Sequence, residues 1–173
     1  KIVDEEGNEL RNGEPGEIIV KGYNIMVGYL DDPDQTAEAI TEDGWLQTGD
    51  IGVMDNDGNI AITDRKKDMY INGGFNVYPA EVEATMLQHQ QIGQVSVVGA
   101  PDTRMGEIGF AFVVPAPGST PNEDQLLDWC KQEMANYKCP REIVFVKELP
   151  LNASGKVLKY ELREIAEEMI NQR

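Results

Sequence analysis

The sequence predicts an α+β protein with two unequal parts. Short strand-like segments separated by turn residues fill residues 1–65, whereas strands alternate with longer amphipathic segments over residues 66–173. The second part has about 105 residues, an ordinary size for one hydrophobic core. We therefore expect a small β-rich unit followed by a compact α+β domain whose helices pack on a small sheet.

The β-rich unit is predicted from two strand segments and frequent turn signals. Residues 17–21 and 59–63 are rich in β-branched residues, and the Asp57-Gly58 pair before the second segment favours a hairpin. One helix interrupts the strands, because Asp32 is a candidate N-cap and Pro33 suits the first helical position. Charged residues at 65–68 separate this unit from the next.

The second unit alternates strands with helices. A hairpin is expected around Gly73-Gly74 and a helix after Pro79. Thr120 and Glu123 have the spacing of a capping box, which predicts a helix with an apolar face. A final helix is expected from the spacing of apolar residues between 158 and 169. The predicted strands are residues 95–98, 108–114 and 143–146.

Composition excludes several classes of function. The net charge of −16 disfavours a nucleic-acid partner, because binding a phosphate backbone needs a basic face. No run of 18 apolar residues predicts a transmembrane segment, and the first residues resemble no targeting peptide, so a cytoplasmic protein is expected. Cys130 and Cys139 fit no metal or disulfide pattern, and His89 lies among polar residues. We expect no metal site, and free thiols.

Two segments in the first half carry candidate functional residues. Residues 44–52 place Asp50 between glycines; they could form a simple turn, or the carboxylate could accept hydrogen bonds from the hydroxyls of a ribose. Residues 63–68 form a charged run, which taken alone is typical of a solvated surface.

Two further segments follow in the second half. Gly73-Gly74 can form a hairpin turn, and paired glycines also let an extended ligand approach the backbone. In residues 149–157, Lys156 follows a small flexible turn that resembles the end of a phosphate-binding loop. The first glycine of that motif is missing and Val157 replaces its Ser or Thr, so the phosphate-loop NTPase interpretation fails.

The order of these segments resembles one enzyme family. W-L-Q-T-G-D, D-R-K-K-D, G-G-F-N-V-Y-P-A-E-V-E and P-L-N-A-S-G-K follow one another as in AMP-forming acyl-CoA synthetases and other adenylate-forming enzymes. Residues 16–22 and 26–30 resemble a stretch near the end of the large domain of that family. The resemblance covers essentially the whole chain, and it is closest to bacterial fatty-acyl and ring-acid CoA ligases.

The resemblance implies a role for five residues. Asp50 would hold the ribose of ATP and AMP, with Arg65 nearby to help fix the nucleotide. Lys67 matches the hinge about which the small C-terminal domain rotates. Gly74 matches the hairpin glycine that lines the pantetheine tunnel of coenzyme A, and Lys156 matches the catalytic lysine of adenylation.

The resemblance also implies what this chain lacks. The phosphate-cradling loop, the adenine and Mg²⁺ segment and the acid pocket of the family are not in the sequence, so we expect a missing large N-terminal domain to supply them. The start at Lys1 suggests a cut within a longer chain. The fragment should then be inactive alone, and the pocket that selects the carboxylic acid should lie in the missing domain. The alternatives are an adenylation domain that loads a carrier protein and a standalone module that binds a nucleotide, CoA or a partner.

Overall fold

The computed structural model describes residues 1–172 and contains two compact units. Unit 1 spans Lys1–Lys67, and unit 2 begins at Asp68. The expected division into residues 1–65 and 66–173, as parts of a larger enzyme, stays a prediction. A short 3₁₀ helix, η1 (Lys66–Asp68), contains the junction between the two units.

Unit 1 is built on a four-stranded antiparallel sheet in the order β1-β2-β3-β4. Residues 55–59 turn between its last two strands, as the Asp57-Gly58 pair predicts. The long third strand passes through the segment around Asp50, so that segment is a strand with irregular register and not a simple turn. The strands are β1 (Ile2–Val3), β2 (Gly16–Val20), β3 (Leu46–Met54) and β4 (Ile60–Arg65).

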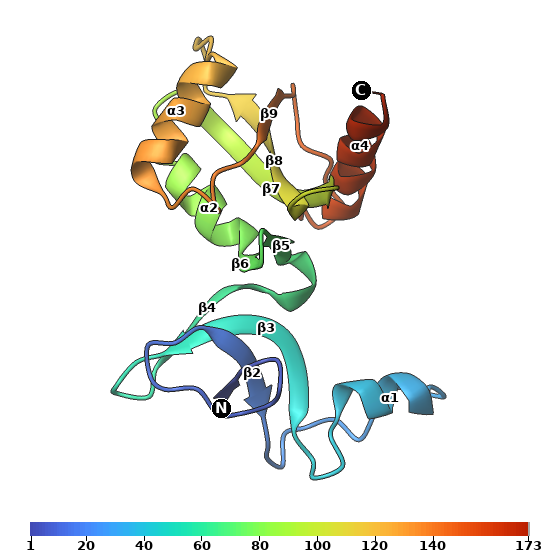
Figure 1. The fold of residues 1–173 in the computed structure, drawn as a ribbon. Coiled ribbons are helices and arrows are strands. Elements are labelled where there is room, and N and C mark those ends of the chain that lie inside the picture. Colours follow the sequence, from blue (N-terminus) through green and yellow to red (C-terminus); the bar gives the residue numbers. More distant parts are fainter. Residues whose placement is uncertain (173) are drawn as a thin grey trace. The chain divides into compact units, whose positions relative to one another are not determined.

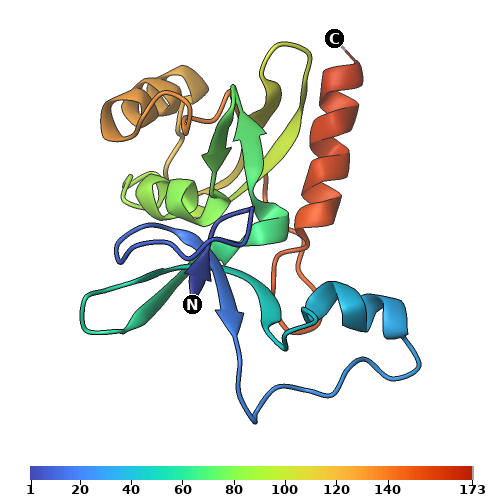
Figure 2. The same cartoon turned by 60° about the horizontal axis from the view of Figure 1, so that its bottom comes forward.

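Helix α1 (Pro33–Ala39) lies at the end of an extended segment of unit 1 (Figure 2). Its predicted N-cap is confirmed, since the Asp32 carboxylate accepts a hydrogen bond from the Gln35 backbone N–H at 2.9 Å. None of its residues is buried. The buried hydrophobic residues of the described part of unit 1 are few: Ile2, Val3, Ile18 and Ile51.

Unit 2 contains a five-stranded mixed sheet. Strands β6, β5, β8 and β7 follow one another in antiparallel pairs, and β9 pairs with β8 in parallel. The antiparallel hairpin of β7 with β8 is the longest ladder of this sheet. The strands are β5 (Tyr70–Asn72), β6 (Phe75–Val77), β7 (Ile92–Asp102), β8 (Gly106–Pro115) and β9 (Glu142–Phe145).

The helices of unit 2 cover both faces of this sheet (Figure 1). Helices α2 (Pro79–Met86) and α3 (Glu123–Glu133) contribute to one apolar cluster, and α4 (Lys159–Asn171) contributes to another. Neighbouring residues of β7 divide accordingly: Val97 belongs to the first cluster and Val98 to the second. Burying each apolar side chain of this size stabilises the folded state by about 1.5–3 kcal/mol. Because helices pack on both faces of a mixed sheet, the predicted α+β fold class is confirmed.

One predicted helix cap is wrong. Thr120 does not cap α3; Asn122 does, and its side-chain oxygen accepts the Gln125 backbone N–H at 3.1 Å. Glu123 therefore occupies the first helical position instead of the third, and its carboxylate accepts the Ile143 N–H of β9 at 3.3 Å. Asparagine ranks above threonine as an N-cap, which is why the helix starts there.

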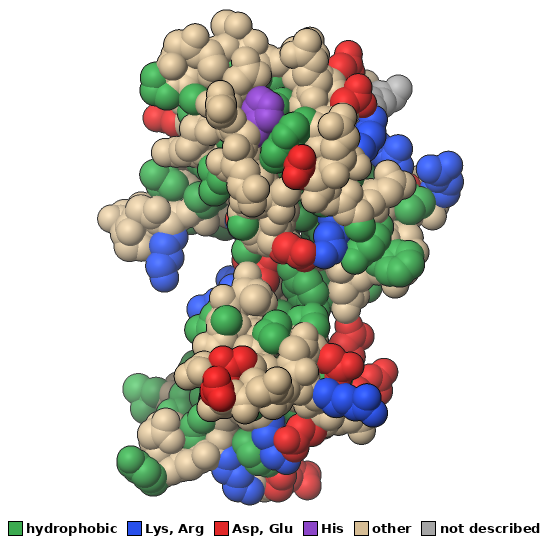
Figure 3. All heavy atoms as spheres, turned by 90° about the vertical axis from the view of Figure 1, so that its left-hand side faces the viewer, with side chains coloured by type: hydrophobic (Ala, Val, Ile, Leu, Met, Phe, Trp, Pro, Cys, Tyr) green, Lys and Arg blue, Asp and Glu red, His purple; other side chains and the backbone are tan. Residues whose placement is uncertain are grey.

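The surface is mixed in charge. Acidic and basic side chains lie interspersed on the face that Figure 3 shows. The acidic residues outnumber the basic ones by 31 to 15 over the whole sequence. A single lysine or arginine can therefore attract an anion only at short range. Among residues 1–172, no helix is both long enough and apolar enough to cross a membrane.

Candidate functional site

The predicted ribose-binding residue Asp50 lies in unit 1 next to Arg65. The two residues pair directly across β3 and β4, and the Arg65 Nε donates to the Asp50 Oδ1 at 2.8 Å. The Asp50 side chain is 25% exposed and the Arg65 side chain 56% exposed. A carboxylate held in this way retains acceptor capacity, which suits hydrogen bonds from vicinal hydroxyl groups.

The backbone before Asp50 is fixed by side chains. Gly49 has φ +69°, a conformation that favours glycine. The Thr48 hydroxyl donates to the Ile18 carbonyl at 2.7 Å and accepts the Asp50 N–H at 3.1 Å. The bond to Ile18 holds β3 against β2 where their register is irregular, and the bond within β3 fixes the backbone from which the Asp50 carboxylate projects.

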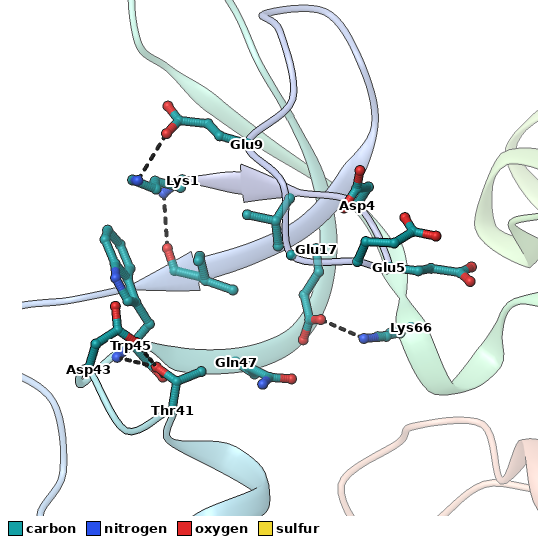
Figure 4. A pocket seen from close by; sticks show the side chains of 14 residues that line it. Lys1, Asp4, Glu5, Glu9, Glu17, Thr41, Asp43, Trp45, Gln47 and Lys66 are labelled. Carbon is teal, nitrogen blue, oxygen red and sulfur yellow. Dashed lines mark hydrogen bonds and ion pairs between the residues drawn. The ribbon is translucent and has the colours of Figure 1, made fainter.

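Glu17, which no sequence pattern indicated as a site residue, supports the same segment. Its side chain is 8% exposed, and both carboxylate oxygens are used. One accepts the Gly49 N–H at 3.1 Å, and the other accepts the Lys66 ammonium at 2.7 Å (Figure 4). Glu17 thus connects the backbone of β3 just before Asp50 to the first residue of η1. The only sequence signal was an acidic residue within an apolar strand, which is weak by itself.

Lys67 is the last residue of unit 1 and lies within η1. Its backbone therefore occupies the junction at which the sequence places a hinge. Its neighbour Asp68 opens unit 2 and forms an ion pair with Arg163 of α4 at 2.7 Å. The hinge role of Lys67 stays a prediction.

Gly74 occupies the two-residue turn between β5 and β6. Gly73 and Gly74 have φ values of +61° and +86°, as a type I′ hairpin turn requires. A Cβ added at Gly73 would lie 2.5 Å from the Met105 Cε, whereas one at Gly74 meets no atom of the described residues within 4 Å. Gly74 therefore presents bare backbone to open space.

Lys156 is exposed on a tight turn that precedes α4. An isolated β-bridge joins Leu151 to Val157, and the Leu158 N–H donates to the Pro150 carbonyl at 2.9 Å. The turn is connected to buried structure on its N-terminal side, where Leu149 belongs to an apolar cluster. The lysine thus sits on an anchored turn and points its amine from an exposed position.

The start of α4 is tied to the sheet by a partly buried ion pair. Lys159 donates to the Glu83 carboxylate at 2.9 Å, and the same oxygen accepts the Val97 N–H at 2.7 Å. Both side chains are less than one-fifth exposed. This contact links α2, β7 and α4 three residues after Lys156, so the turn ends on a fixed element.

A cavity of about 500 Å³ lies beside the β5–β6 hairpin in unit 2. Gly73 and the aromatic residues Phe75 and Tyr137 line it, with the two rings stacked at 4.7 Å between centroids. Lys131 and Arg141 supply two cations. The Asn72 Oδ1, which is buried, has no hydrogen-bond partner within residues 1–172. The other residues that line the cavity are Met105, Leu127, Asn136, Cys139 and Pro140.

The two cysteines are buried thiols, and the histidine packs against an aromatic ring. Cys130 and Cys139 are free thiols in the interior of unit 2, and burial raises the pKa of Cys130 to about 12. A thiol with such a pKa is a poor nucleophile at neutral pH. His89 packs edge-on against Trp129. Over residues 1–172, His, Cys, Asp and Glu side chains form no group of three that could hold a metal ion.

The structure thus brings Asp50 and Arg65 together in unit 1, and it places Gly74 and Lys156 on separate turns of unit 2. Residues 81–156 match the C-terminal domain family of AMP-binding enzymes. The fold and the turn at Lys156 are consistent with this class of domain. The matched segment begins in α2 and ends at Lys156.

Similar proteins extend the match over nearly the whole chain. A CoA ligase of Rhodococcus jostii that acts on a methyl-dioxo-octahydroindenyl propanoate is 55% identical over 158 residues, which is 91% of this chain and 31% of that protein. The long-chain fatty acid CoA ligase of Salmonella typhimurium is 47% identical over 167 residues, 96% of this chain and 29% of that protein.

A solved structure agrees with these relatives. ATP-bound MatB from Rhodopseudomonas palustris has a TM-score of 0.91 and 38% identity, covering 97% of this chain and 34% of that one. Residues 81–156 therefore belong to the C-terminal domain family of AMP-binding enzymes, and nearly the whole chain is similar to enzymes of the adenylate-forming class. It spans about a third of the length of the relatives it matches.

Proposed function

We propose that this chain is part of an AMP-forming acyl-CoA synthetase that acts in the cytoplasm. Such an enzyme activates a carboxylic acid with ATP, releases pyrophosphate, and transfers the acyl group from AMP to CoA. The observation that carries the proposal is the identity of nearly the whole chain to acid–CoA ligases, 55% and 47% in the two relatives named above. The exposed turn at Lys156 and the Asp50–Arg65 pair support it.

The nucleotide is assigned to Asp50 and Arg65 of unit 1. The Asp50 carboxylate is held by Arg65 and by the fixed backbone of residues 48–50, so it can accept both hydroxyls of a ribose without reorganising. Arg65 is more than half exposed, which leaves its guanidinium accessible to the nucleotide. The same pair can serve ATP before adenylation and AMP after it.

The first half-reaction is assigned to Lys156. A carboxylate oxygen of the acid attacks the α-phosphorus of ATP, and the bond to pyrophosphate breaks. Two anions must approach each other, and a positioned ammonium offsets both charges as the transition state forms. Lysine suits this task because it carries a compact charge on a long stem. Its anchored turn limits the freedom of the stem's base.

The second half-reaction is assigned to the hairpin at Gly74 and the neighbouring cavity. The CoA sulfur attacks the acyl carbonyl, the bond to AMP breaks, and the thiol proton is lost. The bare backbone at Gly74 lets a narrow pantetheine chain pass closely. The cavity offers Lys131 and Arg141 for phosphate groups.

The two half-reactions need different faces of the C-terminal domain. The thiol must reach the carbonyl without Lys156 occupying the site, and rotation at a hinge exchanges one face for the other. We assign this hinge to Lys67, at the junction of the units. We also propose that residues 1–65 end a large N-terminal domain and that residues 66–173 form the mobile domain.

The remaining machinery belongs to the rest of the enzyme. The relatives are about three times as long as this chain, so their further residues can provide the phosphate loop, the acid pocket and the ligands of Mg²⁺. Within residues 1–172, the side chains present do not form a metal site that would fit Mg²⁺. We therefore propose that the chain does not catalyse the reaction alone.

Two other functions are distinguishable. A carrier-loading adenylation domain would transfer the acyl group to a carrier protein and not to CoA; the hairpin sequence G-G-F-N-V-Y-P favours the CoA ligases. A standalone module would bind a nucleotide, CoA or a partner without turnover. A longer coding sequence that contains a glycine-rich phosphate loop would exclude the module.

ATP/pyrophosphate exchange tests the proposal in the full-length enzyme. The exchange is measured across a panel of fatty and ring-containing carboxylic acids, and the products are then assayed for acyl-CoA after CoA is added. We expect exchange with at least one acid and a CoA thioester of the same acid. Exchange without any thioester would support carrier loading, and the absence of exchange with every acid would contradict adenylation.

A further inference from the structure

Three turns of this chain share one five-residue hydrogen-bonding pattern. They span residues 4–8, 55–59 and 152–156, and the last one ends at Lys156. In each turn the first residue's N–H donates to the last residue's carbonyl at 2.9–3.0 Å. The fourth residue is a glycine with φ between +80° and +82°, and its N–H donates to the first residue's carbonyl.

The first side chain closes each turn in the same way. Its Oδ1 accepts the backbone N–H of the last residue at 2.8 Å in the first two turns and at 2.9 Å in the third. In the third turn the Asn152 Oδ1 also accepts the Ser154 N–H at 3.0 Å and the Ser154 hydroxyl at 2.8 Å. One amide oxygen therefore organises the two polar residues that surround Gly155.

The turns differ in how the first and last side chains interact. Turns 4–8 and 55–59 begin with aspartate and end with asparagine, and the second carboxylate oxygen accepts the asparagine side-chain N–H at 3.1 and 2.9 Å. These side-chain bonds, together with backbone bonds, lower the pKa of Asp4 and Asp55. The second acceptor oxygen thus captures whatever donor the last side chain offers.

The turn that ends at Lys156 has no such second acceptor. Asn152 carries an N–H₂ donor where aspartate would carry its second oxygen, and a donor cannot bind an ammonium group. In the part of the chain that the structure describes, the Lys156 ammonium makes no hydrogen bond or ion pair, although its backbone N–H is bound.

We propose that Asn152 is a positioning residue that closes the Lys156 turn with a neutral amide and so leaves the ammonium available to substrate anions. The inference rests on the proposed role of Lys156 in adenylation. An aspartate at this position would keep the turn, but its second oxygen would hold the ammonium and offset part of its charge. An alanine would leave the charge and loosen the turn.

The test uses Asn152→Asp and Asn152→Ala in the full-length enzyme. We expect Asn152→Asp to slow adenylation on the order of tenfold, with the deficit shrinking as salt rises because an exposed ion pair is screened. We expect Asn152→Ala to slow adenylation on the order of 10–100-fold through misplacement, with no relief by salt. Thiolysis of pre-formed acyl-adenylate by CoA should stay at the wild-type rate in both variants.

Asp55→Asn is the matched control, since it makes the reverse replacement, of a carboxylate by an amide, in the equivalent turn of unit 1. It should leave both half-reactions unchanged. Hydrogen exchange of the Gly155 and Lys156 amides checks the turn itself: exchange should accelerate in Asn152→Ala and stay slow in Asn152→Asp.

The outcomes separate the inference from the proposed function. Wild-type adenylation in Asn152→Asp, with Lys156→Ala inactive, overturns the inference alone. Equal slowing of both half-reactions in Asn152→Ala overturns it too, because it indicates general disruption. If Lys156→Ala retains adenylation, the proposed role of the lysine fails. The inference about Asn152 then fails with it, even if amide hydrogen exchange shows that the turn is intact.

Discussion

Gly74→Ala separates backbone strain from obstruction of a CoA path. Gly74 has φ +86°, and a Cβ there would contact nothing described within 4 Å. The methyl group therefore costs only the strain of a left-handed alanine, about 1–2 kcal/mol. Domains are stable by about 5–15 kcal/mol, so unit 2 should stay folded. Adenylation, which uses Lys156 on another turn, should change little.

The second half-reaction should respond differently if pantetheine passes over Gly74. A displacement of about 1 Å at a reacting group can cost on the order of 100-fold, so we expect a loss of that order in thioester formation. The assay follows pre-formed acyl-adenylate and CoA in a single turnover, with ATP/pyrophosphate exchange measured in parallel. The expected result is a lower rate of thioester formation with an unchanged rate of ATP/pyrophosphate exchange.

Two comparison variants identify the cause. Asparagine adopts a left-handed conformation at lower cost than alanine but is larger, so Gly74→Asn should be more stable than Gly74→Ala and at least as slow with CoA. Gly73→Ala would instead press on Met105, a contact of 2.5 Å, and should perturb the hairpin. Thiolysis rates that follow stability and not side-chain size would refute the reasoning.

The remaining predictions concern the hinge, the acid response and the division of stability. Lys67→Pro fixes φ and removes an N–H, so it should trap one domain orientation and preserve adenylation better than thioester formation; wild-type rates for both would reject the hinge. Side-chain hydrogen bonds from Asn8 and Asn59 lower the pKa of Asp4 and Asp55 from the ordinary aspartate value. These two carboxylates therefore stabilise unit 1 above that ordinary pKa and lose the contribution as pH falls through the folded pKa. Replacing both aspartates with asparagine should flatten the acid dependence of urea unfolding, and an unchanged dependence would contradict this. In limited trypsin digestion of the 173-residue chain, residues 66–173 should resist longer, because both large apolar clusters of the described residues lie there; preferential survival of the first 65 residues would contradict this.

Local chemistry in the sequence predicted the elements whose signals are short-range. Asp32 caps α1 with its own side chain, and Gly73-Gly74 forms the expected hairpin because positive φ values need glycine. Thr120 failed as a cap since a better capping residue, Asn122, followed two positions later. Each outcome was decided within a few residues.

Long-range contacts could not be predicted in the same way. The pairing of Asp50 with Arg65 depends on the register of β3 and β4, and the Lys66 bond to Glu17 joins residues 49 positions apart. No periodicity of the sequence records such pairings. The parallel addition of β9 to β8 is another case, because a crossover connection hides the partner. The family resemblance supplied candidate site residues that periodicity alone would have left as turns and surface charges.

The most direct test of the account is Lys156→Ala in the full-length enzyme, assayed in both half-reactions. Adenylation, measured by ATP/pyrophosphate exchange, should fall on the order of 10²–10³ or more, since one electrostatic donor of the transition state is removed. Conversion of pre-formed acyl-adenylate to acyl-CoA should stay near the wild-type rate. An equal loss of both half-reactions, or exchange at the wild-type rate, would contradict the assignment of Lys156 to adenylation.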